Sequence, residues 1–193
     1  MAHMTFDFAA ARSNMVDSQV RTSDVTDHAI QDAMRAVARE LLCPADRQSL
    51  AYADVEVPYA PGRSLMRPRE IGKLLQAIKP RPGERALAIA APYAAAVLEA
   101  IGLTVERLDE GDLSAPTGGP YDVIICEGAV TRAPVAWSAA LAEGGRLGVV
   151  ERAGPVGKAM LHLRGETGLG VLEVFDATPP VLPEFEAKAQ FAF

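Results

Sequence analysis

Apolar runs alternate with helical patterns through the second half of the chain. Residues 85–90, RALAIA, form a continuous apolar run that is typical of a central parallel strand buried on both faces. Residues 94–102, AAAVLEAIG, predict a helix that stops at Gly102. Further strands are predicted at TVERLD, YDVIICEGA and RLGVVE, with a helix over VAWSAALAEGG before the last of them. This alternation predicts a doubly wound α/β sheet.

The N-terminal part of the chain predicts helices. Residues 6–21 mix polar and small apolar positions, which favours a helix on the surface of the domain. Residues 26–42 repeat apolar side chains at helical spacing, with Thr26 and Asp27 as the N-terminal cap and Pro44 as the predicted end.

A loop and a closing strand pair complete the predicted organisation. Residues 50–68 show short alternation, three prolines and one glycine, and we expect an extended loop that could fold over a pocket. Pro68 opens the next helix. The stretches KAMLHLRG and VLEVFDA predict two antiparallel strands at the end of the sheet.

The composition limits the expected binding partners and the expected cellular compartment. The chain has 193 residues, 49% of them apolar, and a net charge of −6 without any basic run, which argues against nucleic acid or a membrane surface as a partner. Cys43 and Cys126 are the only cysteines, so we expect two reduced thiols in a cytoplasmic protein and no metal site. No apolar run approaches the length of a membrane span.

Several fragments, in this order and spacing, resemble one known family. They are MVDSQVR, LAYADVEVP followed by a loop and RP, RPGERALAIA, YDVIICEGA, LAEGGRLGVV and the C-terminal FDATPPVLPEF. Together they resemble the protein-L-isoaspartate O-methyltransferases, which use S-adenosylmethionine. The resemblance implies a Rossmann-like methyltransferase sheet.

The resemblance also sets the expected domain boundaries. We expect one methyltransferase-like domain over residues 5–193, with helices and a substrate-type loop in 5–80 and the sheet in 81–193. Residues 1–4, MAHM, are interpreted as a cloning remnant with Met4 as the natural start.

The first departure from the family pattern is the loop after the first sheet strand. Family members carry a G-x-G-x-G loop followed by a tyrosine, whereas here Ala90 stands at the first glycine and Tyr93 at that tyrosine. Glycines let the backbone approach a cofactor and turn sharply, which a Cβ obstructs. Pro92 removes an amide donor, and Ala88 replaces the acid that ends the strand. These changes predict loss of cofactor binding.

The second departure is length. Residues 87–121 are too few for two strand–helix crossovers, which take about 30 residues each, so the sheet is expected to lack about one strand and one helix. In the family an acid at the end of the second strand binds the ribose hydroxyls of the cofactor. Glu106 and Asp109 are the candidates, with solvated surface acids as the alternative interpretation.

The third departure is the catalytic loop. By alignment with the family loop, Ser64 falls on a threonine and Met66 on the serine regarded as the active-site residue, and methionine offers no useful polar group to a carboxylate. No catalytic residue is therefore predicted. Arg63 and Arg67 could face an anionic ligand, or they could be solvated loop charges.

The remaining polar candidates are few. Glu127 is predicted at the carboxyl end of a parallel strand, where open α/β sheets place their ligands, and is the best candidate for a retained functional group, with a helix-capping or loop acid as the alternative interpretation. His28 and His162 are interpreted as structural or surface residues. The glycine pairs at 118–119 and 168–170 are interpreted as turns.

We therefore expect a degenerate family member that has lost S-adenosylmethionine and acts as a binding or scaffold protein, with an unknown protein partner or self-association. One alternative is an active isoaspartyl methyltransferase with an unusual cofactor loop. Another is a pocket repurposed for a different anionic ligand, lined by Arg63, Arg67, Tyr93 and Glu127.

Overall fold

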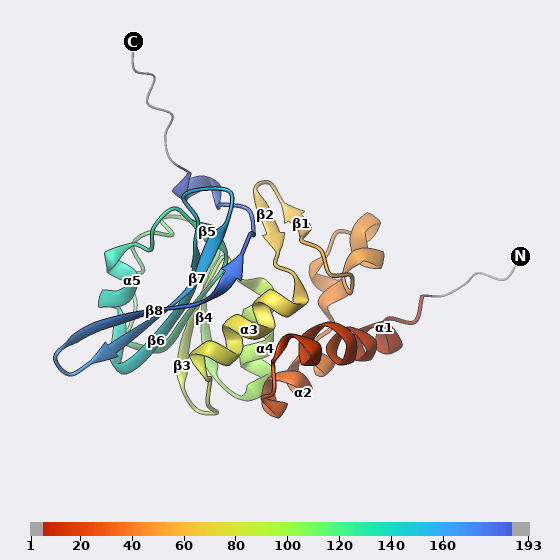
Figure 1. Cartoon of the computed structure of the whole chain (residues 1–193), viewed down its shortest axis with the longest axis horizontal. Coiled ribbons are helices and arrows are strands. Elements are labelled where there is room, and N and C mark those ends of the chain that lie inside the picture. The colour runs from red at the N-terminus through yellow and green to blue at the C-terminus, as the bar shows by residue number, and fades with distance from the viewer. Residues whose placement is uncertain (1–5, 187–193) are drawn as a thin grey trace, which may run out of the picture.

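The computed structural model describes residues 6–186 (Figure 1). The expected remnant at residues 1–4 lies outside this range. The α-helices are α1 (Phe8–Met15), α2 (His28–Ala36), α3 (Pro68–Ile78), α4 (Pro92–Ile101) and α5 (Val135–Ala139). A π-helical turn, Val16–Val20, continues α1, and 3-10 turns span Arg21–Ser23, Arg39–Leu42, Ala45–Leu50 and Pro183–Phe185.

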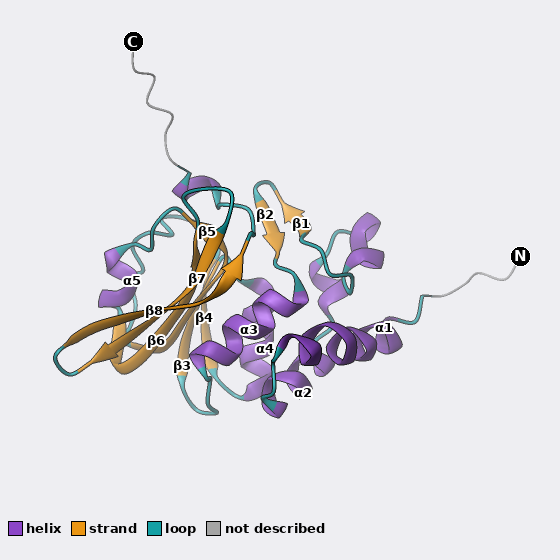
Figure 2. Ribbon diagram, viewed as in Figure 1, coloured by secondary structure: helices purple, strands orange, loops and turns teal. Residues whose placement is uncertain are grey.

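A six-stranded mixed sheet organises the fold, in the order β4-β3-β5-β6-β7-β8 (Figure 2). Its strands are β3 (Arg85–Ile89), β4 (Thr104–Leu108), β5 (Tyr121–Val130), β6 (Leu141–Glu151), β7 (Gly157–Gly165) and β8 (Gly168–Ala177). The first four are parallel, and β7 and β8 add an antiparallel hairpin to β6. The predicted α/β sheet with a closing antiparallel pair is confirmed.

The two faces of the sheet are covered differently. On one face α3 packs against β6 and β7, α4 packs against β3, β4 and β5, and α2 lies over α4 as a further layer. On the other face α5 packs against β6, and its Trp137 lies in a second apolar cluster with Leu113 and Leu141. Because β3 and β5 are buried on both sides, they consist of nearly continuous apolar residues.

The chain uses a single helical crossover on the β3 side. Helix α4 connects β3 to β4, and β4 is an edge strand that, among the strands of residues 6–186, pairs only with β3. Residues 109–120 then lead to β5 without a helix. This agrees with the length argument that only one crossover fits between residues 87 and 121.

Three predicted elements were wrong in extent. Helix α2 ends at Ala36, because Val37 is extended (ψ 123°), and does not continue to Pro44. Helix α5 ends at Ala139, and the residues that follow form the start of the long strand β6. Residues 168–170 begin β8 and are not a turn.

The expected loop over residues 50–68 also contains regular structure. It includes a short antiparallel hairpin of β1 (Val57–Ala60) and β2 (Arg63–Leu65). This hairpin stands beside the carboxyl ends of the sheet strands (Figure 1).

Two features that would bear on function are absent from residues 6–186. Over residues 6–186, every helix is too short or too polar to cross a membrane. Within the same range, His, Cys, Asp and Glu side chains do not gather into a group of three or more that could hold a metal ion.

The role of Gly102 in ending α4 can be tested by substitution. It ends α4 in the left-handed region with φ 106° and donates its amide to Leu98 and Glu99. We expect Gly102→Ala to lower the free energy of unfolding by about 1 kcal/mol, because a Cβ disfavours this conformation. The matched control is Gly154→Ala, where an added Cβ meets no atom within 4 Å. Equal denaturation midpoints for the two variants would contradict this account of the stop.

Candidate functional site at the carboxyl end of the sheet

Glu127 lies at the centre of the candidate site. It sits in the carboxyl half of β5 and is 1% exposed. One carboxylate oxygen, Oε1, accepts a hydrogen bond from the Met66 amide at 3.1 Å. The other, Oε2, accepts from the amides of Tyr93 at 3.1 Å and Ala94 at 3.3 Å.

These two amides are the first free donors of α4. A helix leaves its first N–H groups without intrahelical partners, and a side chain just before the helix normally accepts from them. Ala91 occupies that cap position and has no side-chain acceptor. Glu127 therefore caps α4 from a neighbouring strand and places its charge at the positive end of the helix dipole.

Arg39 faces the same carboxylate and is fully buried. Its Nη1 lies 4.0 Å from Oε1 of Glu127. Its Nε donates to the Ala51 carbonyl at 2.8 Å and its Nη2 to the Met66 carbonyl at 2.6 Å. The guanidinium also lies 4.5 Å from the centre of the Tyr93 ring, so cation, carboxylate and aromatic ring form one internal cluster.

Opposing effects act on the pKa of the Glu127 carboxyl. Burial raises the pKa of the Glu127 carboxyl, while Arg39 and the amides of Met66, Ala94 and Tyr93 act to lower it. Every recorded partner of the two oxygens is a hydrogen-bond donor or a cation. The arrangement therefore suits an ionised carboxylate whose bonding capacity is used within the chain.

The turn between β3 and α4 keeps an unusual backbone. Ala90 has φ 46°, in the left-handed region, and its amide donates to the Leu108 carbonyl at 3.0 Å. A non-glycine residue in this region costs roughly 1–3 kcal/mol. Ala90 and Ala91 are each 1% exposed, so their methyl groups lie in the core.

The residue at the expected catalytic position is part of the same core. Met66 is 0% exposed, its amide donates to Glu127, and its carbonyl accepts from Arg39. Tyr93 is also 0% exposed, and its hydroxyl has no hydrogen-bond partner among residues 6–186. Ser64 lies in β2 opposite Pro58 of β1 and does not reach Glu127 by any recorded contact.

The two arginines suggested for an anionic ligand have carboxylate partners in the chain. Arg63 makes a bidentate pair with Glu184 at 2.9 and 2.5 Å, and its side chain is 13% exposed. Arg67 pairs with Glu56 at 2.9 Å. Both positive charges are therefore neutralised without a ligand.

Residues 178–185, here called the C-terminal segment, cross the carboxyl end of β5 (Figure 1). Ala129 donates its amide to the Pro180 carbonyl at 2.9 Å and accepts from the Leu182 amide at 2.8 Å. Leu182 packs so closely over Gly128 that a Cβ there would lie 2.8 Å from its side chain.

Beyond Leu182 the segment contacts both sides of the site. Pro183 packs on Gly62 of the β1–β2 hairpin, and Glu184 pairs with Arg63. Phe185 contacts Trp137 edge to face at 5.5 Å and accepts from the Thr131 hydroxyl at 2.9 Å. The C-terminal segment therefore covers the end of the sheet from the hairpin to α5.

The two candidate ribose acids occupy different positions. Glu106 pairs with Arg85 at 3.1 Å on exposed parts of β3 and β4, which matches the surface-acid interpretation. Asp109 directly follows β4, and partial burial raises the pKa of its carboxyl against the opposing effects of Arg107 and Arg63. Neither acid contacts the Glu127 cluster in any recorded interaction.

Sequence reasoning did not identify Arg39. It was included in a predicted helix to Leu42, and no local pattern distinguished it from a solvated arginine. The early end of α2 turns this residue inward, where its partner comes from a strand far along the chain. The sequence around it, VARELL, places an Arg–Glu pair between apolar residues, and this pattern is too common to be specific.

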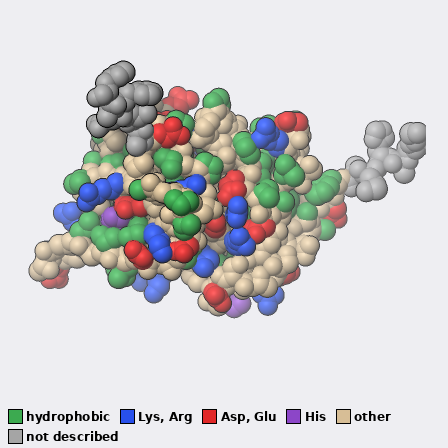
Figure 3. All heavy atoms as spheres, turned by 45° about the horizontal axis from the view of Figure 1, so that its top comes forward, with side chains coloured by type: hydrophobic (Ala, Val, Ile, Leu, Met, Phe, Trp, Pro, Cys, Tyr) green, Lys and Arg blue, Asp and Glu red, His purple; other side chains and the backbone are tan. Residues whose placement is uncertain are grey.

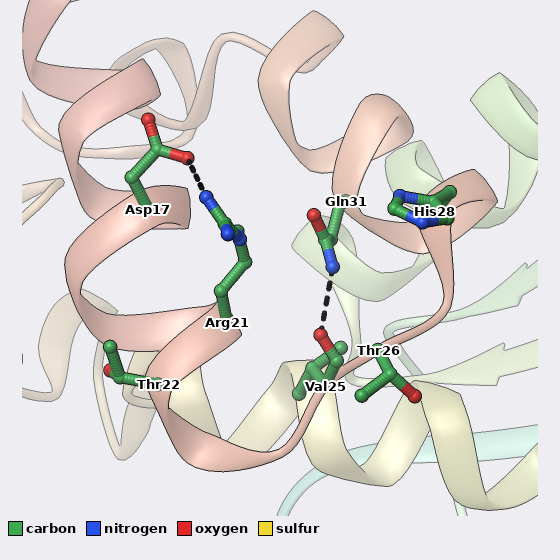
Figure 4. Close-up of a pocket in the computed structure, with 7 residues that line it drawn as sticks. All are labelled: Asp17, Arg21, Thr22, Val25, Thr26, His28 and Gln31. Atoms are coloured by element: carbon green, nitrogen blue, oxygen red, sulfur yellow. Dashed lines mark hydrogen bonds and ion pairs between the residues drawn. The ribbon is translucent and has the colours of Figure 1, made fainter.

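One hollow of about 290 Å³ lies beside the site and is lined in part by Tyr59 of β1, whose hydroxyl donates to the Ala90 carbonyl at 3.5 Å. Larger hollows lie farther from the site. One cavity of about 420 Å³ opens between the end of the first helical segment and α2, and seven residues line it (Figure 4). Two of its polar groups are already paired, Arg21 with Asp17 and the Gln31 amide with the Val25 carbonyl. Every lining residue falls within positions 17–31, so this cavity shares no residue with the Glu127 cluster.

Comparison with known proteins identifies clear relatives. The chain is 34% identical over 181 residues to a protein from Methylorubrum populi named protein-L-isoaspartate O-methyltransferase, covering 80% of this chain and 85% of the relative. A protein of the same name from Methylorubrum extorquens is 33% identical over 184 residues, covering 81% and 80%. No protein-family model matches the chain.

Solved structures agree on the fold. A Plasmodium falciparum structure described as a protein-L-isoaspartate O-methyltransferase in complex with S-adenosyl-L-homocysteine has a TM-score of 0.73 at 14% identity. The match covers 90% of this chain and 98% of that one. A second structure of that enzyme name has a TM-score of 0.70 at 18% identity, covering 88% and 65%.

The buried pair can be tested by a double-mutant cycle. We expect Arg39→Met and Glu127→Gln each to lower the free energy of unfolding by about 3–5 kcal/mol, because each leaves a buried group without its partner. The double variant should lose less than the sum by at least about 1 kcal/mol in chemical denaturation.

The control cycle is Arg107→Met and Glu99→Gln. This exposed pair lies at 2.9 Å, with side chains 40% and 46% exposed. Its coupling should stay below about 1 kcal/mol. Strictly additive effects at Arg39 and Glu127 would show that the two side chains do not stabilise the fold as a pair.

Proposed function

This chain belongs to the protein-L-isoaspartate O-methyltransferase family, and we propose that it is a non-catalytic member that acts by binding a partner. The observation that carries this proposal is the Glu127 carboxylate on the first free amides of α4. These amides lie at the carboxyl end of β3, where open α/β sheets receive their ligands. In this chain an internal carboxylate uses them.

The residues around this point do not fit S-adenosylmethionine. Ala90 and Ala91 put buried methyl groups in the turn that needs glycine for close approach of a cofactor. Tyr93 and Met66 are fully buried, and Leu182 closes over Gly128. We therefore assign no methyl-transfer step to this site.

The position at which the family resemblance expected the active-site serine supports the same proposal. Met66 has no hydrogen-bonding group suited to an incoming carboxylate, and its side chain is enclosed. The arginines nearest to it in the chain are neutralised by Glu184 and Glu56. This pairing also argues against a pocket repurposed for another anion.

An active S-adenosylmethionine-dependent isoaspartyl methyltransferase is the second candidate. Two observations favour it: relatives at 33–34% identity carry that enzyme name, and Ala90 keeps the left-handed backbone of a tight turn. Positioning and desolvation could carry much of the acceleration, since the sulfonium is already electrophilic. Cofactor affinity distinguishes this candidate from the first.

Isothermal titration of S-adenosylmethionine and S-adenosylhomocysteine is the deciding experiment. We expect no binding heat up to millimolar ligand, with the Methylorubrum populi relative as the positive control. Dissociation constants in the micromolar range, about −8 kcal/mol, would overturn the non-catalytic assignment and favour the active enzyme.

A single substitution should not restore catalysis. We expect Met66→Ser to give no methylation of an isoaspartyl peptide, because the amides and space of the cofactor site stay occupied by Glu127 and its neighbours. The assay would follow transfer of a labelled methyl group, again with the relative as control. Detectable turnover by Met66→Ser would contradict the proposal.

A further inference from the structure

The C-terminal segment, residues 178–185, is bound to the sheet by main-chain pairing. Ala129 donates to the Pro180 carbonyl at 2.9 Å and accepts from the Leu182 amide at 2.8 Å, which makes a parallel bridge between Ala129 and Val181. Extended peptides that bind to proteins use the same kind of pairing for affinity, and their side chains supply specificity. The segment is therefore held in the manner of a peptide ligand.

Two glycines shape the surface under this segment. Gly128 of β5 (φ 141°) lies under Leu182, and Gly62 of the β1–β2 hairpin (φ 67°) lies under Pro183. A Cβ at Gly128 would lie 2.8 Å from the Leu182 side chain, and a Cβ at Gly62 would overlap the Pro183 ring. The surface that contacts the segment, here called the docking surface, consists of Gly62, Arg63, Gly128, Ala129 and Trp137.

One charge and one aromatic ring complete the docking surface. The Arg63 side chain is only 13% exposed, and its recorded carboxylate partner among residues 6–186 is Glu184. An occupant must therefore bring a carboxylate, because a largely buried cation is costly without one. Trp137 receives the Phe185 ring edge to face at 5.5 Å. Among the coloured residues of Figure 3, positive and negative side chains are interspersed, so a single charged contact and not a broad charged patch selects the occupant.

The segment can leave this surface without disturbing the sheet. It follows β8, the last strand of the six-stranded sheet, so its departure breaks no pairing among those strands. Its start is fixed by Arg152, which donates to the carbonyls of Thr178 and Pro179 at 3.0 and 2.9 Å. Three of its eight residues are prolines, which donate no amide, and Glu184 is exposed. Few backbone bonds and an exposed outer side are typical of segments that open locally.

We propose that the docking surface binds an extended peptide of a partner protein, with leucine, proline, an acid and an aromatic residue in that order, and that the C-terminal segment is its internal competitor. The order is that of residues 182–185, which occupy the surface in this structure. This inference rests on the proposed function, the binding of a partner, and specifies the class of partner.

Peptide binding to the full chain tests the proposal. The probe is a fluorescein-labelled peptide of residues 181–186, Val-Leu-Pro-Glu-Phe-Glu, followed by anisotropy. The double variant Glu184→Ala, Phe185→Ala loses two anchors of its own segment and keeps the docking surface intact. It should bind the probe at least about tenfold more tightly than the wild type, in which the internal competitor lowers the fraction of open molecules. Equal affinities, or no binding to the double variant, would overturn the proposal.

Three controls test the contacts themselves. A peptide with arginine in place of its first glutamate should not bind, because Arg63 would face a like charge. Adding Arg63→Ala to the double variant should also abolish binding of the original probe. The matched control protein is Glu173→Ala, Val174→Ala in β8, which loses an acid and a hydrophobic side chain away from the docking surface and should bind like the wild type. Binding that is insensitive to Arg63→Ala would contradict the proposal.

Amide exchange of the wild type gives a second measurement that depends on no variant. The Leu182 amide should exchange faster than the buried amides of β3, because the segment opens while the sheet stays folded. Equal protection would show that the segment leaves only on global unfolding and would overturn the proposal. The titration with S-adenosylmethionine tests the proposed function separately: cofactor binding would overturn the non-catalytic assignment, whereas failure of the peptide to bind would overturn only this inference.

Discussion

The architecture at the carboxyl end of the sheet depends on one buried carboxylate. A charged group without water must be hydrogen-bonded and paired, or the fold loses several kcal/mol. Glu127 meets this requirement with three backbone amides and Arg39. Its partners come from three other parts of the chain: the start of α4, the connection from β2 to α3, and the turn after α2. The carboxylate therefore joins the N-terminal helices to the sheet.

This interaction is also the basis of the function proposed for this end of the sheet. In an open α/β fold the carboxyl ends of the strands and the helix N-termini beside them form a ligand crevice. Here the helix amides are capped from within, Met66 and Tyr93 fill the space, and the C-terminal segment closes over the top. A region that receives ligands in open α/β folds has here the burial and packing of a core, which is the physical basis for the proposal that it carries no methyl-transfer chemistry.

Some elements of this fold are set by the local sequence, whereas the ends of others are set by contacts with distant parts of the chain. Strands β3, β4 and β5 and the Gly102 stop were predicted because continuous burial and a left-handed cap leave direct marks on the sequence. The ends of α2 and α5 were predicted wrongly. The apolar spacing continues past Ala36, but the chain turns there so that Arg39 can enter the core. After Ala139 the polypeptide joins β6 in the sheet, and strand pairing outweighs the local helical pattern.

The sequence by itself determined the fold class, the single crossover, and the loss of glycines and serine at the positions where the family resemblance expected them. It also marked Glu127 as a polar group in an unusual place. Only the tertiary structure decided what that group does. The spacing of residues along the chain carries no information on whether a distant arginine reaches a carboxylate. Arg39, the α4 amides and the C-terminal segment converge on Glu127 because the sheet and its layers bring them together, and burial then requires that their charges and hydrogen bonds be satisfied by one another.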